Sequence, residues 1–181
     1  MLRDLGGIYK RSTPVPGTSP SSEAFAYLLL RADEDPLHVY SLAAHYSFEE
    51  LAVPASTKAL RIRLSDVGEH SAIIMGASYL LRLAHLHSDR LSALKSLLLS
   101  PPALHEDTDT CKLRDRLSVQ RAFSLTAGYL AWEATASVGT DWIRSFFEKV
   151  IEDIECPLCW ENVRQRMEVV LEKWEGTKAT I

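Results

Sequence analysis

Two cysteines separated by two residues, Cys156 and Cys159, are the sharpest chemical signal in the sequence. Thiolates at this spacing can bind one metal ion, and a tetrahedral zinc site then needs two further ligands. Cys111 is the only other cysteine, and His105 lies six residues before it in a polar segment. One interpretation of the sequence is therefore a Zn site formed by Cys156, Cys159, Cys111 and His105.

The cysteine pair has two other interpretations. Cys-Pro-x-Cys resembles the active-site tetrad of glutaredoxins, in which a strand precedes the motif and a helix N-terminus lowers the pKa of the first thiol. Here residues 150–155 continue an acidic helical pattern, whose carboxylates are expected to raise the pKa of Cys156. A Cys156 pKa well below ~8.5 would favour thiol-redox chemistry. The favoured interpretation is two small apolar residues at a tight corner between helices.

No other motif in the sequence indicates catalysis. There is no Gly-x-Ser-x-Gly elbow, no glycine-rich phosphate loop and no His-Glu-x-x-His. His85 and His87, two positions apart on a predicted helix, point in opposite directions and cannot share a metal ion. The acidic residues at 106–109 lack the ligand spacing of a calcium loop. We therefore expect a protein that is not an enzyme.

The composition narrows the class of protein and its partners. The 181 residues include 20 Lys+Arg and 24 Asp+Glu, a net charge of −4, which argues against nucleic acid as the main partner. Three cysteines are too few for a disulfide scaffold and suit a reducing compartment, so an intracellular protein, cytoplasmic or nuclear, is expected. No signal peptide and no apolar run of ~18 residues is present, so no membrane association is expected.

Helical periodicity runs from residue 21 to the C-terminus, and no alternating strand pattern competes with it. The sequence predicts an all-α fold, an irregular array of about six to seven helices. Proline and polar segments divide it into a flexible leader (1–20), an N-terminal helical lobe (21–100), a polar linker (101–117) and a C-terminal helical lobe (118–181) with the cysteine corner.

Local signals predict where individual helices begin and which faces they bury. Asp35-Pro36 favours a helix start capped by Asp35, and Ser47 with Glu50 fits a capping box. Pro54 is expected to kink or restart the helix that contains it. In the C-terminal lobe, one helix is predicted to bury an apolar stripe made of Ala122, Leu125, Tyr129 and Trp132.

The four tryptophans gather in the C-terminal third of the chain, where core packing is their default role. Part of the set is also a candidate for contacts with a partner, because tryptophan is enriched among residues that dominate protein interfaces. The candidate anchors for a protein partner are Trp142, Trp160 and Trp174.

Three stretches resemble the helical region that follows the BTB/POZ core in a large family of basidiomycete-type fungal proteins. The first includes Asp35-Pro36-Leu37-His38-Val39-Tyr40, the second is Gly76-Ala77-Ser78-Tyr79-Leu80, and the third is Cys156-Pro157-Leu158-Cys159 with the helix before it. Together they cover roughly residues 21–90 and 140–175, and the first is the most specific.

The resemblance implies a helical, non-enzymatic protein-interaction or adaptor module, with no catalytic residue to carry over. The POZ core expected before residue 21 is missing, so its dimerisation and cullin-adaptor roles do not carry over. The identity of the protein partner and the oligomeric state stay open. A zinc-stabilised scaffold and a thiol-redox protein using Cys156 and Cys159 remain the alternative functions.

Overall fold

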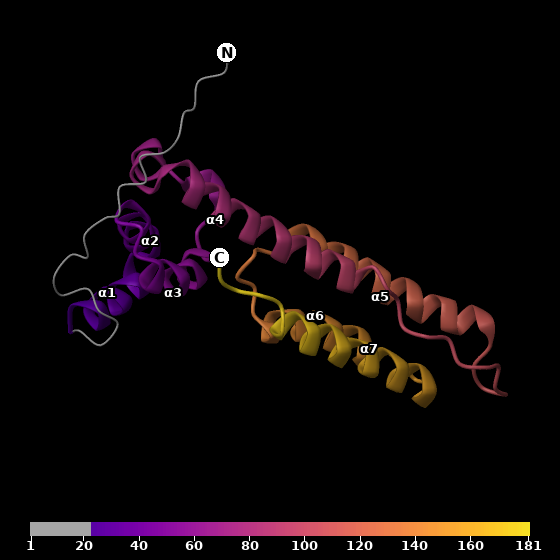
Figure 1. The fold of residues 1–181 in the computed structure, drawn as a ribbon. Helices are drawn as coiled ribbons and strands as arrows, with labels where there is room; N and C mark the ends of the chain where they lie inside the picture. The colour runs from indigo at the N-terminus through magenta and orange to yellow at the C-terminus, as the bar shows by residue number, and fades with distance from the viewer. Residues whose placement is uncertain (1–22) are drawn as a thin grey trace, which may run out of the picture. The chain divides into compact units, whose positions relative to one another are not determined.

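Residues 23–181 are described by a computed structural model, in which helices are joined by turns and irregular segments (Figure 1). Within this range no strand occurs, which confirms the all-α prediction, whereas the predicted leader, residues 1–20, lies outside it. The elements are α1 (Glu23–Glu34), α2 (Pro36–His45), α3 (Glu49–Ala59), the short 3-10 helix η1 (Leu64–Asp66), α4 (Glu69–Leu98), α5 (Leu113–Glu133), α6 (Thr140–Glu152) and α7 (Pro157–Glu175).

The described chain divides into two compact units. The first contains the residues up to Leu81 together with Ile181, and the second contains Arg82–Thr180. The division falls inside α4, whereas the sequence predicts an N-terminal lobe that ends at residue 100. Residues 101–117, expected as a polar linker, belong to the second unit, and their last part already forms the first turns of α5.

The local signals in the first unit had mixed outcomes. Asp35 caps α2 as predicted, because its carboxylate accepts a hydrogen bond from the His38 amide at 3.1 Å. The predicted capping box was wrong: Phe48 is the N-cap of α3, and Ser47 adopts a φ of 52° in the turn before it. α3 also continues through Pro54, so the missing amide removes one helical hydrogen bond without ending the helix.

Four helices contribute the core of the second unit, which is the part that carries the cysteine motif. Apolar side chains from α4, α5, α6 and α7 pack together, and Trp174 is the largest of those that are fully buried. The members of this core are Leu94, Leu98, Phe123, Ala127, Leu130, Ile143, Phe147, Val163, Met167, Val170, Leu171 and Trp174.

The predicted buried stripe of α5 was wrong. Leu125 and Trp132 are 76% and 86% exposed, whereas Phe123, Ala127 and Leu130 face the core. The helix carries two apolar stripes at helical spacing, and periodicity alone does not say which one the other helices cover.

Arg90, on α4, is buried, with only 8% of its surface exposed. It joins three segments of the second unit. Its Nε donates to the Ala136 carbonyl at 2.8 Å, and its Nη1 donates to the carbonyls of Thr177 and Lys178 at 2.7 and 3.0 Å. The guanidinium also lies over the Trp174 ring, 4.3 Å from its centroid. The α5–α6 connection and the C-terminal residues are thereby held against α4.

We predict that Arg90→Lys destabilises the protein by about 2–3 kcal/mol, because one ammonium cannot replace the three directed hydrogen bonds of the guanidinium. Chemical denaturation followed by circular dichroism measures the change in unfolding free energy. Arg121→Lys, at an exposed position of α5, is the matched control and should change it by less than about 0.5 kcal/mol. Equal effects of the two substitutions would contradict the role given to Arg90.

Candidate metal centre

The segment between α4 and α5, residues 99–112, has no helix of its own and is held in place by polar side chains of α7. Asn162 donates to the Ala103 carbonyl at 3.0 Å, and the Arg166 guanidinium donates to the Ser100 carbonyl at 2.7 Å. These contacts satisfy backbone carbonyls that no secondary structure pairs. They also fix the path of the segment that carries His105 and Cys111.

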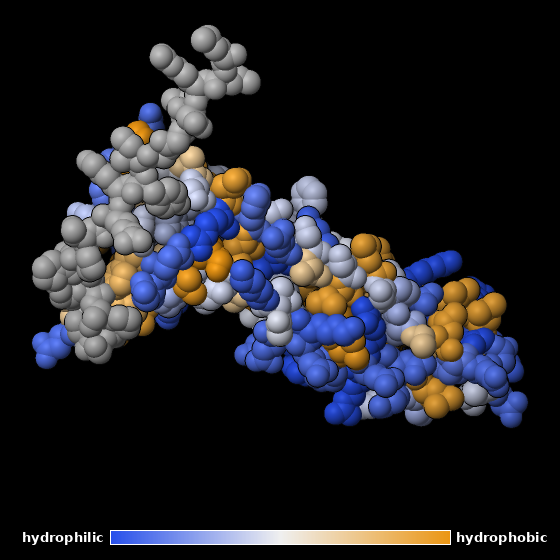
Figure 2. Space-filling model, in the orientation of Figure 1, coloured by the Kyte–Doolittle hydropathy of each residue, from blue (hydrophilic) through white to orange (hydrophobic). Residues whose placement is uncertain are grey.

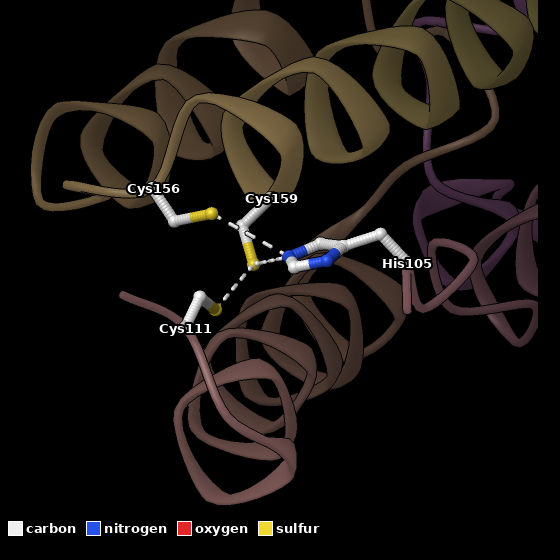
Figure 3. A group of neighbouring side chains, drawn as sticks. All are labelled: His105, Cys111, Cys156 and Cys159. Carbon is white, nitrogen blue, oxygen red and sulfur yellow. Dashed lines mark hydrogen bonds between the residues drawn. The ribbon is translucent and has the colours of Figure 1, made fainter. Parts of the chain in front are cut away.

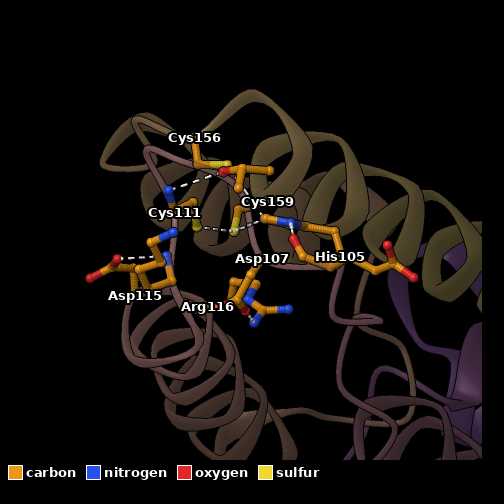
Figure 4. A network of polar contacts seen from close by, with 10 residues as sticks. His105, Asp107, Cys111, Asp115, Arg116, Cys156 and Cys159 are labelled. Carbon is orange, nitrogen blue, oxygen red and sulfur yellow. Dashed lines mark hydrogen bonds and ion pairs between the residues drawn. The ribbon is translucent and has the colours of Figure 1, made fainter.

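Further contacts fix the end of this segment at the start of α5 (Figure 4). Thr108 and Cys111 bond to each other twice: the Thr108 amide donates to the Cys111 carbonyl at 3.1 Å, and the Cys111 amide donates to Thr108 Oγ1 at 3.0 Å. The buried guanidinium of Arg116 forms an ion pair with Asp107. Cys111 is therefore held in a closed turn, and its side chain is 1% exposed.

The other two cysteines lie at the start of α7. Cys156 is the N-cap residue, Pro157 occupies the first helical position, and Cys159 follows in the first turn. Proline is well suited to that position because its missing amide would have no partner in the helix. N-cap and first-turn side chains lie near each other, so the local geometry of Cys-Pro-x-Cys brings both sulfurs to the same end of the helix.

All four side chains point toward one another (Figure 3). The His105 Nε2 atom lies 3.2 Å from Cys159 Sγ and 3.4 Å from Cys156 Sγ, and Cys111 Sγ lies 3.7 Å from Cys159 Sγ. The four ligand atoms all lie within 4.8 Å of one another. The structure thus brings together the residues that the metal interpretation of the sequence requires, and this group can bind a metal ion.

Three of the six separations between the ligand atoms are close to those of a tetrahedral metal site, and the others lie within 4.8 Å. With metal–sulfur bonds of about 2.3 Å and metal–nitrogen bonds of about 2.0–2.1 Å, the vertices of a tetrahedron lie roughly 3.5–3.8 Å apart. The separations of 3.2, 3.4 and 3.7 Å lie within a few tenths of an ångström of these values. A disulfide requires sulfurs about 2.05 Å apart, and all three cysteines are free thiols here.

A backbone contact orients the imidazole for metal binding. His105 Nδ1 lies 2.5 Å from the Glu106 carbonyl oxygen, which can only accept a hydrogen bond, so Nδ1 carries the proton and donates it. The lone pair of Nε2 then points to the sulfurs. Hydrogen bonding of the second ring nitrogen is the usual way in which proteins fix the tautomer of a metal-binding histidine.

The environment separates the pKa values of the three thiols. The backbone amides of Cys159 and Leu158, at the start of α7, lower the pKa of Cys156 to about 7. Burial raises the pKa of Cys159 to about 12, and it also raises the pKa of Cys111. The expectation that carboxylates of residues 150–155 raise the pKa of Cys156 was wrong, because the helix N-terminus stabilises the thiolate more strongly.

The predicted tryptophan anchors occupy different environments. Trp174 is 2% exposed and donates from Nε1 to the Val138 carbonyl at 2.9 Å, so it belongs to the core and is inaccessible to a partner. Trp142 and Trp160 are half-buried, with Trp142 packed on Phe146. A partner-binding role for these two stays a prediction. The most exposed tryptophan is Trp132.

The residues that position the ligands carry no signal in the sequence. Asn162, Arg166 and Arg116 support the segment from other helices, and the Glu106 carbonyl sets the histidine tautomer. These contacts are polar. Two of the four join residues 59 and 66 positions apart, and the other two follow no local spacing pattern.

Comparison with known proteins assigns no family. No protein-family model matches the chain, and no match was found among curated proteins or solved structures. The resemblance to fungal BTB/POZ proteins therefore remains a prediction. In residues 23–181, no helix has the length and apolar character needed to cross a membrane.

In metal-free, reduced protein, we predict that iodoacetamide alkylates Cys156 faster than the other two cysteines. Its thiolate is half formed at about pH 7, so the rate should rise with pH and reach half its maximum there. Cys111 and Cys159 stay protonated and buried at that pH. Mass spectrometry of each cysteine peptide measures the rates, and a Cys156 midpoint at ordinary thiol values, near ~8.5, would contradict the assignment.

Proposed function

We propose that this chain is a non-enzymatic protein-interaction scaffold whose second unit is stabilised by one structural zinc ion bound to His105, Cys111, Cys156 and Cys159. The observation that carries the proposal is the convergence of these four ligand atoms within 4.8 Å. Two of them come from the irregular segment before α5 and two from the start of α7.

The donor set favours zinc and a structural role. Three thiolates and one imidazole are soft to borderline ligands, and tetrahedral Cys3His sets are typical of structural zinc. Calcium and magnesium prefer oxygen ligands, which this group does not supply. Four protein ligands leave no open position for water or substrate, whereas a catalytic zinc ion keeps one.

Zinc binding would link the segment 99–112 to α7, two parts of the chain that share little apolar packing. The segment 99–112 contributes few side chains to the core, and its backbone depends on contacts with α7. An ion bound to His105 and Cys159 links residues 54 positions apart in sequence. Because the ligands must lose their protons, binding also opposes the raised pKa values of Cys111 and Cys159 and releases protons.

The interaction role is supported by the sequence resemblance and by exposed aromatic surface. The helical region of fungal BTB/POZ proteins, which the sequence resembles, implies an adaptor without catalytic residues. Trp142 and Trp160 are partly accessible beside the core of the second unit. An intracellular setting, cytoplasmic or nuclear, keeps the three thiols reduced and able to bind metal.

A thiol-redox function is the second candidate, and one observation favours it. Cys156 has a pKa of about 7 at the start of a helix, which is the feature that activates the first cysteine of Cys-x-x-Cys oxidoreductases. Two observations favour zinc instead: the motif follows α6 and a short connection, with no strand, and both His105 and Cys111 adjoin the pair. An insulin-reduction assay with metal-free, reduced protein separates the candidates, and we expect no activity.

We predict that the purified protein contains one zinc ion per chain and that chelation lowers its stability. With free zinc at about 1,000 times the dissociation constant, binding contributes about 4 kcal/mol, or a Tm shift of roughly 8–16 °C for a domain of this size. Elemental analysis measures the stoichiometry, and calorimetry with and without chelator measures the Tm shift.

Matched variants assign the ligands. Cys111→Ser and His105→Ala should lose bound zinc and lose the chelator-dependent shift in Tm. His85→Ala, which removes an exposed histidine on α4, should keep both. Full zinc content in the Cys111 and His105 variants, or no zinc in the wild type with zinc supplied, would overturn the proposed centre.

We also predict that Trp160→Ala reduces recovery of a protein partner captured from cell extract, while leaving zinc content unchanged. Trp160 follows Cys159 directly, and the Arg164 guanidinium lies 5.1 Å from its ring centroid. Quantitative mass spectrometry of captured proteins measures the recovery, with His85→Ala as control. Absence of any partner enriched by the wild type would remove the interaction part of the proposal.

A further inference from the structure

One face of α5 is apolar and exposed over residues 122–132. We call Ala122, Leu125, Tyr129 and Trp132 the outer stripe of α5. Leu125, Tyr129 and Trp132 are 76%, 49% and 86% exposed, and Ala122 is exposed as well. Figure 2 shows that hydrophobic residues reach the surface of this unit among hydrophilic ones. Single exposed apolar side chains are ordinary on a protein surface. A row of large apolar side chains along one helix face is typical of an interaction surface.

The apolar surface continues from α5 onto α6. The ring of Tyr129 lies 5.2 Å from that of Phe146, and the Phe146 ring lies 4.9 Å from that of Trp142, measured between centroids. Phe146 and Trp142 are half-buried, so their outer edges widen the surface beside the outer stripe. Three aromatic rings in contact form a rigid platform, which costs little conformational entropy when a partner covers it.

We propose that the outer stripe of α5 binds the same stripe of a second copy of this chain, with the two α5 helices antiparallel. The two copies would be related by a twofold axis level with Ala127. A twofold pair uses one patch twice, so the patch must be complementary to itself. The residue sizes along α5 meet this condition.

The sizes of the side chains fit an antiparallel pair. Such a pair brings residues that lie equally far before and after position 127 to the same level. Ala122 then lies level with Trp132 of the second copy, and Leu125 lies level with Tyr129. Each large indole faces a position with only a methyl group, and the two medium side chains fill the centre. A parallel pair would instead place Trp132 level with Trp132 and leave a gap at Ala122.

Sedimentation equilibrium of the zinc-loaded, reduced full chain tests this inference up to roughly 100 µM chain. We expect a dimer of twice 20.3 kDa in the wild type. Leu125→Glu should raise the dimer dissociation constant at least tenfold, because it places two carboxylates in the apolar contact. Leu99→Glu, at an 81% exposed leucine outside the stripe, is the matched control and should leave the dissociation constant unchanged.

A size exchange tests the pairing itself. Trp132→Ala should weaken the dimer, and Ala122→Trp combined with Trp132→Ala should restore it, because the indole and the methyl group exchange places across the contact. Circular dichroism checks that each variant keeps its helices. A wild type that stays monomeric at all concentrations, or an unchanged dimer in Leu125→Glu, would overturn the inference. Failure of the size exchange to restore the dimer would overturn the antiparallel register.

Discussion

The proposed zinc centre depends on the convergence of four ligand atoms from two distant segments of the second unit. His105 and Cys111 lie on an irregular segment, and Cys156 and Cys159 lie at the start of α7. Placing three sulfurs and a nitrogen within 4.8 Å of one another gains little without an ion, because thiols form weak hydrogen bonds. An ion at the centre would convert this arrangement into four strong bonds and give the segment a fixed end.

The rest of the unit supplies a rigid frame for that group. Apolar side chains from four helices form its core, and Arg90 holds the α5–α6 connection and the C-terminal residues against α4. Because α7 is anchored in this core, its N-terminus keeps Cys156 and Cys159 in place, and its polar side chains position the segment opposite. The ligand group therefore lies between a stable helix and a segment with little stability of its own, where a metal ion contributes most.

Periodicity predicted the helical class because it is a local property, whereas of the two predicted caps only that of α2 was confirmed. The all-α class and the Asp35 cap of α2 follow from short patterns, and the four ligand candidates follow from counting cysteines and nearby histidines. Long-range properties were harder to predict. The stripe containing Leu125 and Trp132 has the spacing of a core face, yet Phe123, Ala127 and Leu130 face the core. The direction of the Cys156 pKa shift required the backbone amides of α7, which no residue type reveals.

X-ray absorption at the zinc edge tests most directly whether three cysteines and one histidine bind the ion. It reports the atoms bound to zinc and does not depend on the function of the protein. The account predicts a first shell of three sulfur atoms at about 2.3 Å and one nitrogen atom at about 2.0–2.1 Å in the wild type. His105→Ala, which is expected to lose its bound zinc, should lose this zinc-edge signal at the same protein concentration. A wild-type first shell of nitrogen and oxygen atoms without sulfur would contradict the account.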